Sequence, residues 1–161
     1  MKLYLIQHGL FLPEDVDPQK ALSEEGREET LKIAKFLKTK NIKATVIWHS
    51  KKLRSVQTAK ILFEHIPNTE TQERSDLNPL DAVDKFPEEI RRMNNDLIIV
   101  GHMPFLQRVS SLLLAGAQDF DLVSFRYSGV LCLERIENWR IAWFVTPDIV
   151  STVILAGNLK R

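Results

Sequence analysis

The sequence predicts an α/β protein with a mostly parallel central sheet and an antiparallel edge formed by its C-terminal part. Short apolar runs typical of buried strands alternate with longer segments of helical periodicity along most of the chain. Two of these runs, Leu3–Ile6 and Leu97–Val100, are each followed by a histidine where the chain turns. Near the C-terminus, Ser128–Ile136 and Trp139–Val145 form two further strand-like segments, which indicates a hairpin added to the sheet.

The composition is typical of a globular protein without unusual charge. The chain has 161 residues, an apolar fraction of 44% and a charged fraction of 27%, so we expect a single domain over residues 1–161. The net charge of +1 gives no electrostatic reason to expect binding to nucleic acid or to a membrane surface. No apolar run approaches membrane-spanning length, and the strand at residue 3 leaves no room for a signal peptide, so we expect a cytoplasmic protein. The single cysteine, Cys132, lies in an apolar run and is expected in the core.

The first strand, Leu3–Ile6, leads directly into Gln7-His8-Gly9. Gly9 allows the backbone to turn sharply or to approach a ligand closely, so we include it among the candidate substrate contacts. A histidine at the carboxyl end of a buried strand lies where open α/β sheets bind ligands. Taken alone, the pattern around His8 favours a polar strand end before a turn over a functional residue.

A long helix is expected after a polar, acidic loop. Ser23 is its candidate N-cap, and the helix runs to about Lys40. Gly26 lies in its first turns, which indicates either close packing or simple tolerance of a poor helix former. A second buried strand is expected at Ala44–Trp48. The predicted buried stripe of the helix consists of Thr30, Ile33, Ala34 and Leu37.

The next helix begins with a group of cations. Ser50 is its candidate N-cap, and we expect it to end before Pro67. Lys51, Lys52 and Arg54 lie at its start, where cations are disfavoured unless an anion site is being built. We expect the two lysines to point into water and Arg54 to point along the sheet edge towards the histidines.

The polar segment that follows ends in a second histidine. Residues 67–95 are interrupted by prolines, which predicts a loop region with one short helix at about Pro87–Met93. Leu97–Val100 then repeats the design of the first strand, and Gly101-His102 follows. Because the carboxyl ends of parallel strands lie at the same edge of a sheet, we expect the two histidines to converge.

A further helix is expected over Pro104–Leu114, and Gly116 is expected to end it. The tail from Ile149 is apolar and then basic, and its pattern predicts no particular element. The residues expected to face inward from the helix are Leu106, Val109, Leu112 and Leu113.

Four motifs follow one another along the chain: Gln7-His8-Gly9, Leu22–Gly26, Ser50 through Arg54 to Ala59, and Gly101-His102 with Pro104. In this order they resemble those of the histidine phosphatase superfamily, which includes phosphoglycerate mutases and acid phosphatases. Within it, the likeness is to short SixA-like phosphohistidine phosphatases, over nearly the full length. The resemblance implies a three-layer α/β/α sandwich of the phosphoglycerate mutase-like kind, with His8 as nucleophile and Arg54 and His102 gripping a phosphoryl group.

Gln7 departs from the family pattern, which has arginine before the nucleophilic histidine. Arginine offers a permanent charge and a fork of donors that matches phosphate, whereas glutamine keeps two N–H donors without the charge. We therefore expect Gln7 to bind substrate but to weaken catalysis. Arg108 and Arg126 are candidates to compensate for the missing cation.

The expected mechanism is an in-line attack of neutral His8 on phosphorus, which gives a phosphohistidine intermediate that water cleaves. Arg54, the Gln7 amide and His102 as an imidazolium would neutralise the phosphoryl oxygens. The acid that protonates the leaving group is not fixed by the sequence. The two loop candidates are Asp81 and Glu14.

We expect neither a metal nor another cofactor, because His49 and His65 lack the spacing of metal ligands. The short segment between Pro67 and Asn95 resembles the branch without a large cap, which implies an open site suited to a phosphorylated protein side chain. Phosphohistidine on a protein is therefore the first expected substrate. The alternatives are a phosphatase for a small phosphorylated metabolite and a non-catalytic phosphate or phosphopeptide binder.

Overall fold

The computed structural model describes residues 1–150, so the end of the domain expected over residues 1–161 and most of the C-terminal tail lie outside the described part. The strands are β1 (Lys2–Gln7), β2 (Val46–Ser50), β3 (Glu70–Arg74), β4 (Leu97–Gly101), β5 (Val130–Arg135) and β6 (Trp139–Val145). The labelled helices are α1 (Glu24–Thr39), α2 (Leu53–Phe63), α3 (Phe86–Arg91) and α4 (Phe105–Ala115), and residues 147–150 are also helical.

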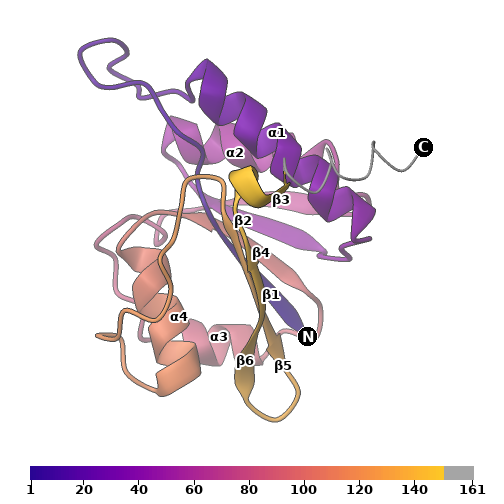
Figure 1. Cartoon of the computed structure of the whole chain (residues 1–161). Helices are drawn as coiled ribbons and strands as arrows, with labels where there is room; N and C mark the ends of the chain where they lie inside the picture. Colours follow the sequence, from indigo (N-terminus) through magenta and orange to yellow (C-terminus); the bar gives the residue numbers. More distant parts are fainter. Residues whose placement is uncertain (151–161) are drawn as a thin grey trace.

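A six-stranded sheet lies between two helical layers (Figure 1), with the strands in the order β3-β2-β4-β1-β5-β6. The strands from β3 to β1 in this order run parallel, whereas β5 and β6 join antiparallel. The predicted three-layer α/β/α sandwich with an antiparallel C-terminal edge is therefore confirmed. Of the helices in residues 1–150, none is long and apolar enough to cross a membrane.

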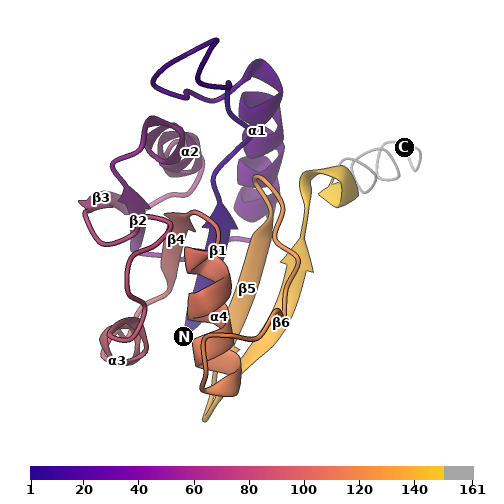
Figure 2. The ribbon, with the colours of Figure 1, turned by 90° about the vertical axis from the view of Figure 1, so that its left-hand side faces the viewer.

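The two faces of the sheet carry separate cores, and β1 contributes to both because its side chains alternate. Tyr4 and Ile6 pack on the side of α1 and α2, while Leu3 and Leu5 pack on the side of α3 and α4. Figure 2 shows the two pairs of helices on opposite faces. Cys132 is buried in the first core, as predicted, and burial raises the pKa of its thiol to about 12.

The prediction for α1 is confirmed in detail. The Ser23 hydroxyl accepts a hydrogen bond from the Gly26 main-chain N–H at 3.0 Å, which makes it the N-cap. A Cβ atom added at Gly26 would come within 2.0 Å of the Leu10 carbonyl oxygen, so the glycine is required by close packing. The predicted stripe is buried: Thr30, Ile33, Ala34 and Leu37.

Two predictions for the middle of the chain are wrong. Ser50 does not cap a helix but ends β2, and α2 begins at Leu53. The Ser50 hydroxyl is fully buried and hydrogen-bonds to His102, which follows β4. This tertiary contact overrides the preference of serine for a helix N-cap. The segment 67–95 also contains β3 in addition to the expected short helix. Its five residues are polar and mostly exposed at the edge of the sheet, so no apolar run marks them.

A smaller difference concerns α4, where Leu112 and Leu113 are only half-buried. The buried face instead centres on Phe105, Leu106 and Val109, which lie nearer the start of the helix. The helix ends at Gly116 as predicted, with φ of 74° at that glycine.

Candidate active site

His8 and His102 meet because their strands are neighbours in the sheet. Gln7 pairs with Gly101 at the last register position of β1 and β4, and the His8 main-chain N–H donates to the Gly101 carbonyl at 3.1 Å. The two imidazole rings follow immediately, with centroids 4.8 Å apart. Both side chains are buried, His8 at 4% and His102 at 2% exposure. The predicted convergence is what the structure shows.

Glycines allow the flanking helices to approach these strand ends closely. A Cβ atom at Gly9 would come within 2.7 Å of the Thr30 hydroxyl, and one at Gly101 within 2.9 Å of the Leu106 side chain. The Gly9 N–H donates to the Thr58 hydroxyl at 3.0 Å, so this amide is already engaged within the protein. Gly9 therefore fixes the backbone beside the histidine.

His8 is held in one tautomer. Its Nδ1 lies 2.8 Å from the Gly9 carbonyl oxygen, which only accepts, so we assign the proton to Nδ1. Its Nε2 accepts a hydrogen bond from the Nε–H of Arg54 at 3.2 Å. Burial, the largest cause, and the Arg54 charge together lower the pKa of His8 to about 4, against the opposing effect of the Gly9 bond. At neutral pH, His8 is a neutral imidazole with the lone pair of Nε2 towards a cation.

Arg54 points from the first turn of α2 to this nitrogen, as the sequence predicted. Its guanidinium carbon also lies 4.6 Å from the centroid of the Phe11 ring, a cation–π contact that holds the side chain at the site. Burial lowers the pKa of Arg54, whereas the nearby Tyr127 phenol raises it. Arginine remains charged in either case.

His102 has different partners. Its Nε2 lies 2.6 Å from the Ser50 hydroxyl, and its buried Nδ1 has no hydrogen-bond partner within the described chain. Burial, with smaller contributions from His8, Arg54 and Lys52, lowers the pKa of His102 to about 3. The expected imidazolium is therefore not the favoured form in this structure, since it would need a neighbouring anion to offset burial.

Gln7 is nearly buried, at 9% exposure, and the alternation along β1 turns its side chain towards the face covered by α4. Its Oε1 has no hydrogen-bond partner in residues 1–150. Neither candidate replacement cation reaches it. Arg108 donates to the Gln118 side chain and to the Asp81 carbonyl, and Arg126 lines a cavity next to Tyr127. Within residues 1–150, neither makes a hydrogen bond to the unpartnered Oε1 of Gln7.

The two acid candidates have other partners. The Asp81 carboxylate accepts from the Asn78 main chain at 2.7 Å and from the Asn78 side chain at 2.9 Å. Glu14 forms an exposed ion pair with Lys20 at 2.7 Å, on the loop between β1 and α1 that projects from the body of the molecule (Figure 1). In the part of the chain that the structure describes, neither carboxylate bonds to His8 or His102.

The structure adds site residues that the sequence did not single out. The Phe11 and Tyr127 rings lie 5.3 Å and 5.6 Å from the His8 ring, measured between centroids. Tyr127 is brought there by Ser128, whose N–H donates to the Gln7 carbonyl at 3.0 Å. No local pattern marks Tyr127, since its place depends on β5 lying beside β1.

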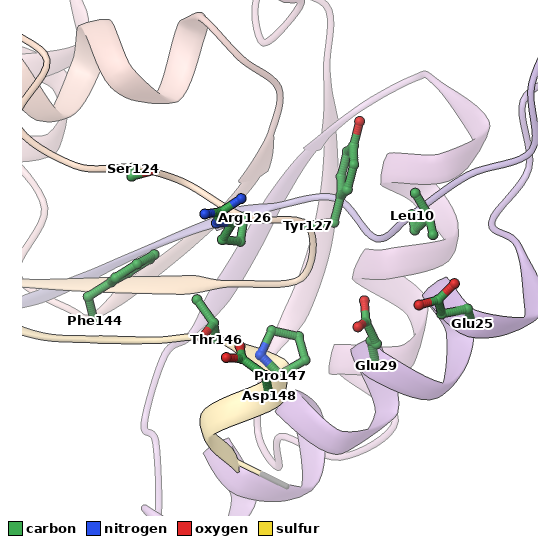
Figure 3. Close-up of a pocket in the computed structure, with 10 residues that line it drawn as sticks. All are labelled: Leu10, Glu25, Glu29, Ser124, Arg126, Tyr127, Phe144, Thr146, Pro147 and Asp148. Carbon is green, nitrogen blue, oxygen red and sulfur yellow. The ribbon is translucent and has the colours of Figure 1, made fainter. Parts of the chain in front are cut away.

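A cavity of about 590 Å³ opens next to Tyr127 (Figure 3). Of its lining residues, Tyr127 contacts the His8 ring. Its lining combines carboxylates, one guanidinium and apolar surface: Leu10, Glu25, Glu29, Ser124, Arg126, Tyr127, Phe144, Thr146, Pro147 and Asp148. Among residues 1–150, no group of three or more histidine, cysteine, aspartate or glutamate side chains is placed to hold a metal ion.

The fold and this arrangement define a class of protein, three-layer α/β/α sandwiches with two histidines and an arginine at the carboxyl edge of a parallel sheet. The sequence profile of the histidine phosphatase superfamily (branch 1) matches residues 3–85, and the chain belongs to this superfamily. No curated protein sequence is significantly similar to the chain.

Solved structures confirm the expected SixA-like fold. The protein histidine phosphatase SixA in complex with tungstate superposes with a TM-score of 0.83 at 17% identity, over 93% of this chain and 99% of that one. A candidate SixA phosphohistidine phosphatase from Agrobacterium tumefaciens gives 0.75 at 18% identity, over 90% and 97% of the two chains. Mycobacterial glucosyl-3-phosphoglycerate phosphatase, in complex with VO3, gives 0.71 at 14% identity, over 88% and 97%.

Proposed function

We propose that the protein is a phosphatase that passes a phosphoryl group first to His8 and then to water, and that its substrate is phosphohistidine on a protein. One observation carries the proposal. His8 is a buried, neutral imidazole whose Nδ1–H is tied to the Gly9 carbonyl, so its Nε2 lone pair is directed at the Arg54 cation. A nucleophile of this kind needs no base to remove a proton before it attacks.

In the first step, Nε2 of His8 attacks phosphorus, a nitrogen–phosphorus bond forms and the bond to the leaving group breaks. The electron pair of that bond goes to the leaving group, which takes up a proton from solvent, and the attack of water in the second step returns one proton to solvent. In the second step, water attacks the phosphorus of phospho-His8, and inorganic phosphate and neutral His8 are released. The Gly9 carbonyl accepts the Nδ1–H throughout and stabilises the positive charge on the ring of the intermediate.

Binding of the phosphoryl group is assigned to Arg54, His102 and Gln7. Arg54 supplies a permanent cation next to the attacking nitrogen. His102 has a nitrogen without a hydrogen-bond partner within residues 1–150, and a phosphoryl dianion would raise its pKa and favour its charged form. The contribution of Gln7 is a neutral amide donor. The reaction as proposed uses no metal ion.

A phosphorylated protein side chain is favoured by the openness of the site. The segment between β3 and β4 forms only α3 and turns, so it adds no large domain over the histidines. A nitrogen leaving group also suits the surroundings of His8, since no carboxylate bonds to it in the described residues. An imidazole is far less basic as a leaving group than an alkoxide and needs less help from an acid. SixA, named as a protein histidine phosphatase, has the same fold.

The test compares wild type, His8→Ala and His65→Ala on a phosphohistidine peptide and on an artificial phosphomonoester. His65 is the matched control, because it is half-buried, bonds to the Ile61 carbonyl and follows the opposite end of α2 from Arg54. We expect turnover by wild type and His65→Ala and none by His8→Ala. Retained turnover in His8→Ala would reject the nucleophile. Binding of phosphate without turnover by wild type would favour a non-catalytic binder, and preference for the phosphomonoester a small-molecule phosphatase.

A further inference from the structure

Tyr127 places an aromatic ring at the mouth of the phosphoryl site. Its ring centroid lies 5.6 Å from that of His8, with 35° between the ring planes. It also makes an edge contact with Phe11, at 6.0 Å between centroids. Tyr127 is 37% exposed, whereas His8 is buried, so this ring lies at the boundary between the nucleophile and solvent.

The position of Tyr127 is fixed by the residue that follows it. Ser128 is fully buried with a left-handed φ of 58°, and its N–H donates to the Gln7 carbonyl. Its hydroxyl hydrogen-bonds to the Thr30 hydroxyl of α1 at 2.9 Å. The turn formed by Tyr127 and Ser128 is thus hydrogen-bonded both to β1, which leads to the nucleophile, and to α1. Tyr127 is a preorganised surface and not a loosely held loop residue.

The reaction geometry directs the leaving group to this ring. In an in-line displacement, the leaving group lies on the side of phosphorus opposite to the attacking Nε2. That nitrogen is at the buried sheet edge, so the leaving group points outward. Besides His102, the rings in contact with His8 in residues 1–150 are those of Phe11 and Tyr127. Beyond Tyr127 lies the 590 Å³ cavity, with the tyrosine hydroxyl directed away from the carboxylates of Glu29 and Asp148 (Figure 3).

We infer that Tyr127 is a specificity-determining residue, which packs against the leaving group and favours a planar ring there over an aliphatic chain. The adjoining part of the substrate lies in the cavity that Tyr127 borders. The inference rests on the proposed phosphatase function and adds the basis of its selectivity. The face of a tyrosine attracts another ring by dispersion and by quadrupole interaction, and an aliphatic hydroxyl group gains much less.

The experiment uses two peptides of the same sequence that carry phosphohistidine or phosphoserine at one position. They are compared on wild type, Tyr127→Leu, Tyr127→Phe and the control Phe63→Leu, which removes an exposed aromatic ring from the far end of α2. We expect Tyr127→Leu to raise KM for the phosphohistidine peptide about two- to tenfold, the range of one aromatic pair, with kcat and the phosphoserine KM nearly unchanged. Tyr127→Phe keeps the ring and should retain the preference for the phosphohistidine peptide, whereas Phe63→Leu should behave as wild type.

A binding measurement separates this inference from the proposed function. In a His8→Ala background, which cannot form the intermediate, the added Tyr127→Leu change should weaken the phosphohistidine peptide by the same factor and leave the phosphoserine peptide unaffected. Equal losses on both peptides, or a loss in Tyr127→Phe as large as in Tyr127→Leu, would overturn the role of the ring. Absence of turnover by wild type would instead reject the phosphatase, while the binding result would still decide the role of Tyr127.

Discussion

The two strand ends that carry His8 and His102 follow one design in sequence but differ in their hydrogen bonds. Each histidine follows a buried apolar strand, and burial lowers the pKa of both, to about 4 for His8 and about 3 for His102. His8 is tied through Nδ1 to the main chain of the next residue. His102 is tied through Nε2 to the side chain of Ser50, which belongs to another strand.

Because their hydrogen-bond partners differ, His8 and His102 are suited to different roles in the reaction. A carbonyl partner fixes the tautomer, so His8 presents a lone pair at Nε2 and is suited to attack. A hydroxyl partner both donates and accepts, so His102 can change its protonation state without losing the Ser50 bond. The strand pattern therefore sets where a histidine lies, and its hydrogen-bond partner sets what it can do.

The largest predicted effect separates the two histidines directly. His102→Ala should lower kcat about a hundredfold to a thousandfold, as for the loss of one preorganised group at a developing charge, but should still form phospho-His8. His8→Ala should form no phosphoenzyme at all. Single-turnover measurements on both variants distinguish slow from absent transfer. A His102→Ala variant without phosphoenzyme would mean that the two residues act as one unit.

The Ser50 bond gives the next test. Ser50→Ala leaves the buried Nε2 of His102 without its partner, and we expect kcat/KM to fall about tenfold, with a shifted pH profile. Ser110→Ala is a matched control, because Ser110 is also buried but bonds to the Gln107 carbonyl within α4. If both variants changed kcat/KM equally with unaltered pH profiles, the Ser50 effect would be one of stability alone.

Substitutions of Gln7 test whether its neutral amide binds the phosphoryl group beside the nucleophile. Gln7→Arg should raise kcat/KM by up to about tenfold, because a charge-assisted fork binds phosphate about twice as strongly as a neutral amide. Neither Arg108 nor Arg126 bonds to Gln7, so the new cation would duplicate no existing contact. Gln7→Ala should lose activity. If Gln7→Ala matches wild type and Gln7→Arg gives no gain, then Gln7 is not part of the phosphate clamp.

The lowered pKa values predict how stability depends on pH. Both histidines are neutral in the folded protein, whereas in the unfolded chain they gain protons below about pH 6.5. The free energy of unfolding therefore receives the full contribution of the two neutral histidines above that pH. This contribution is lost as the pH falls towards 4, by at most about 1.4 kcal/mol per pH unit for each histidine. Urea unfolding of wild type, His8→Asn/His102→Asn and His65→Asn between pH 7.5 and 4.5 measures this. A double variant as pH-sensitive as wild type would contradict the assignment.

Much of the fold and part of the site were predictable because they depend on local patterns. The apolar runs before His8 and His102 identify buried parallel strands, and parallel strands bring their ends together. Ser23 and the stripe after it identified α1 for the same reason. The direction of Arg54 followed from its place in the first turn after a strand.

What the sequence did not predict depends on neighbours in space. Glu70–Arg74 forms a strand because the edge of β2 offers partners for its backbone, although its side chains are polar. Ser50 has the residue type of a helix cap, but a buried histidine competes successfully for its hydroxyl. Tyr127 reaches His8 through the pairing of β5 with β1 and the bonds of Ser128. None of these contacts has a periodic signal.

The central claim is that Nε2 of His8 carries the phosphoryl group during turnover. Wild type is mixed with a substrate that carries a labelled phosphoryl group, and the reaction is stopped rapidly with alkali, in which phosphohistidine survives. Peptide mapping then identifies the labelled residue, and phosphorus NMR identifies the nitrogen that carries the label. We predict one label per active chain, on His8 and at Nε2, that disappears at the rate of phosphate release. A label on another residue or at Nδ1, or turnover without any label, would contradict the account.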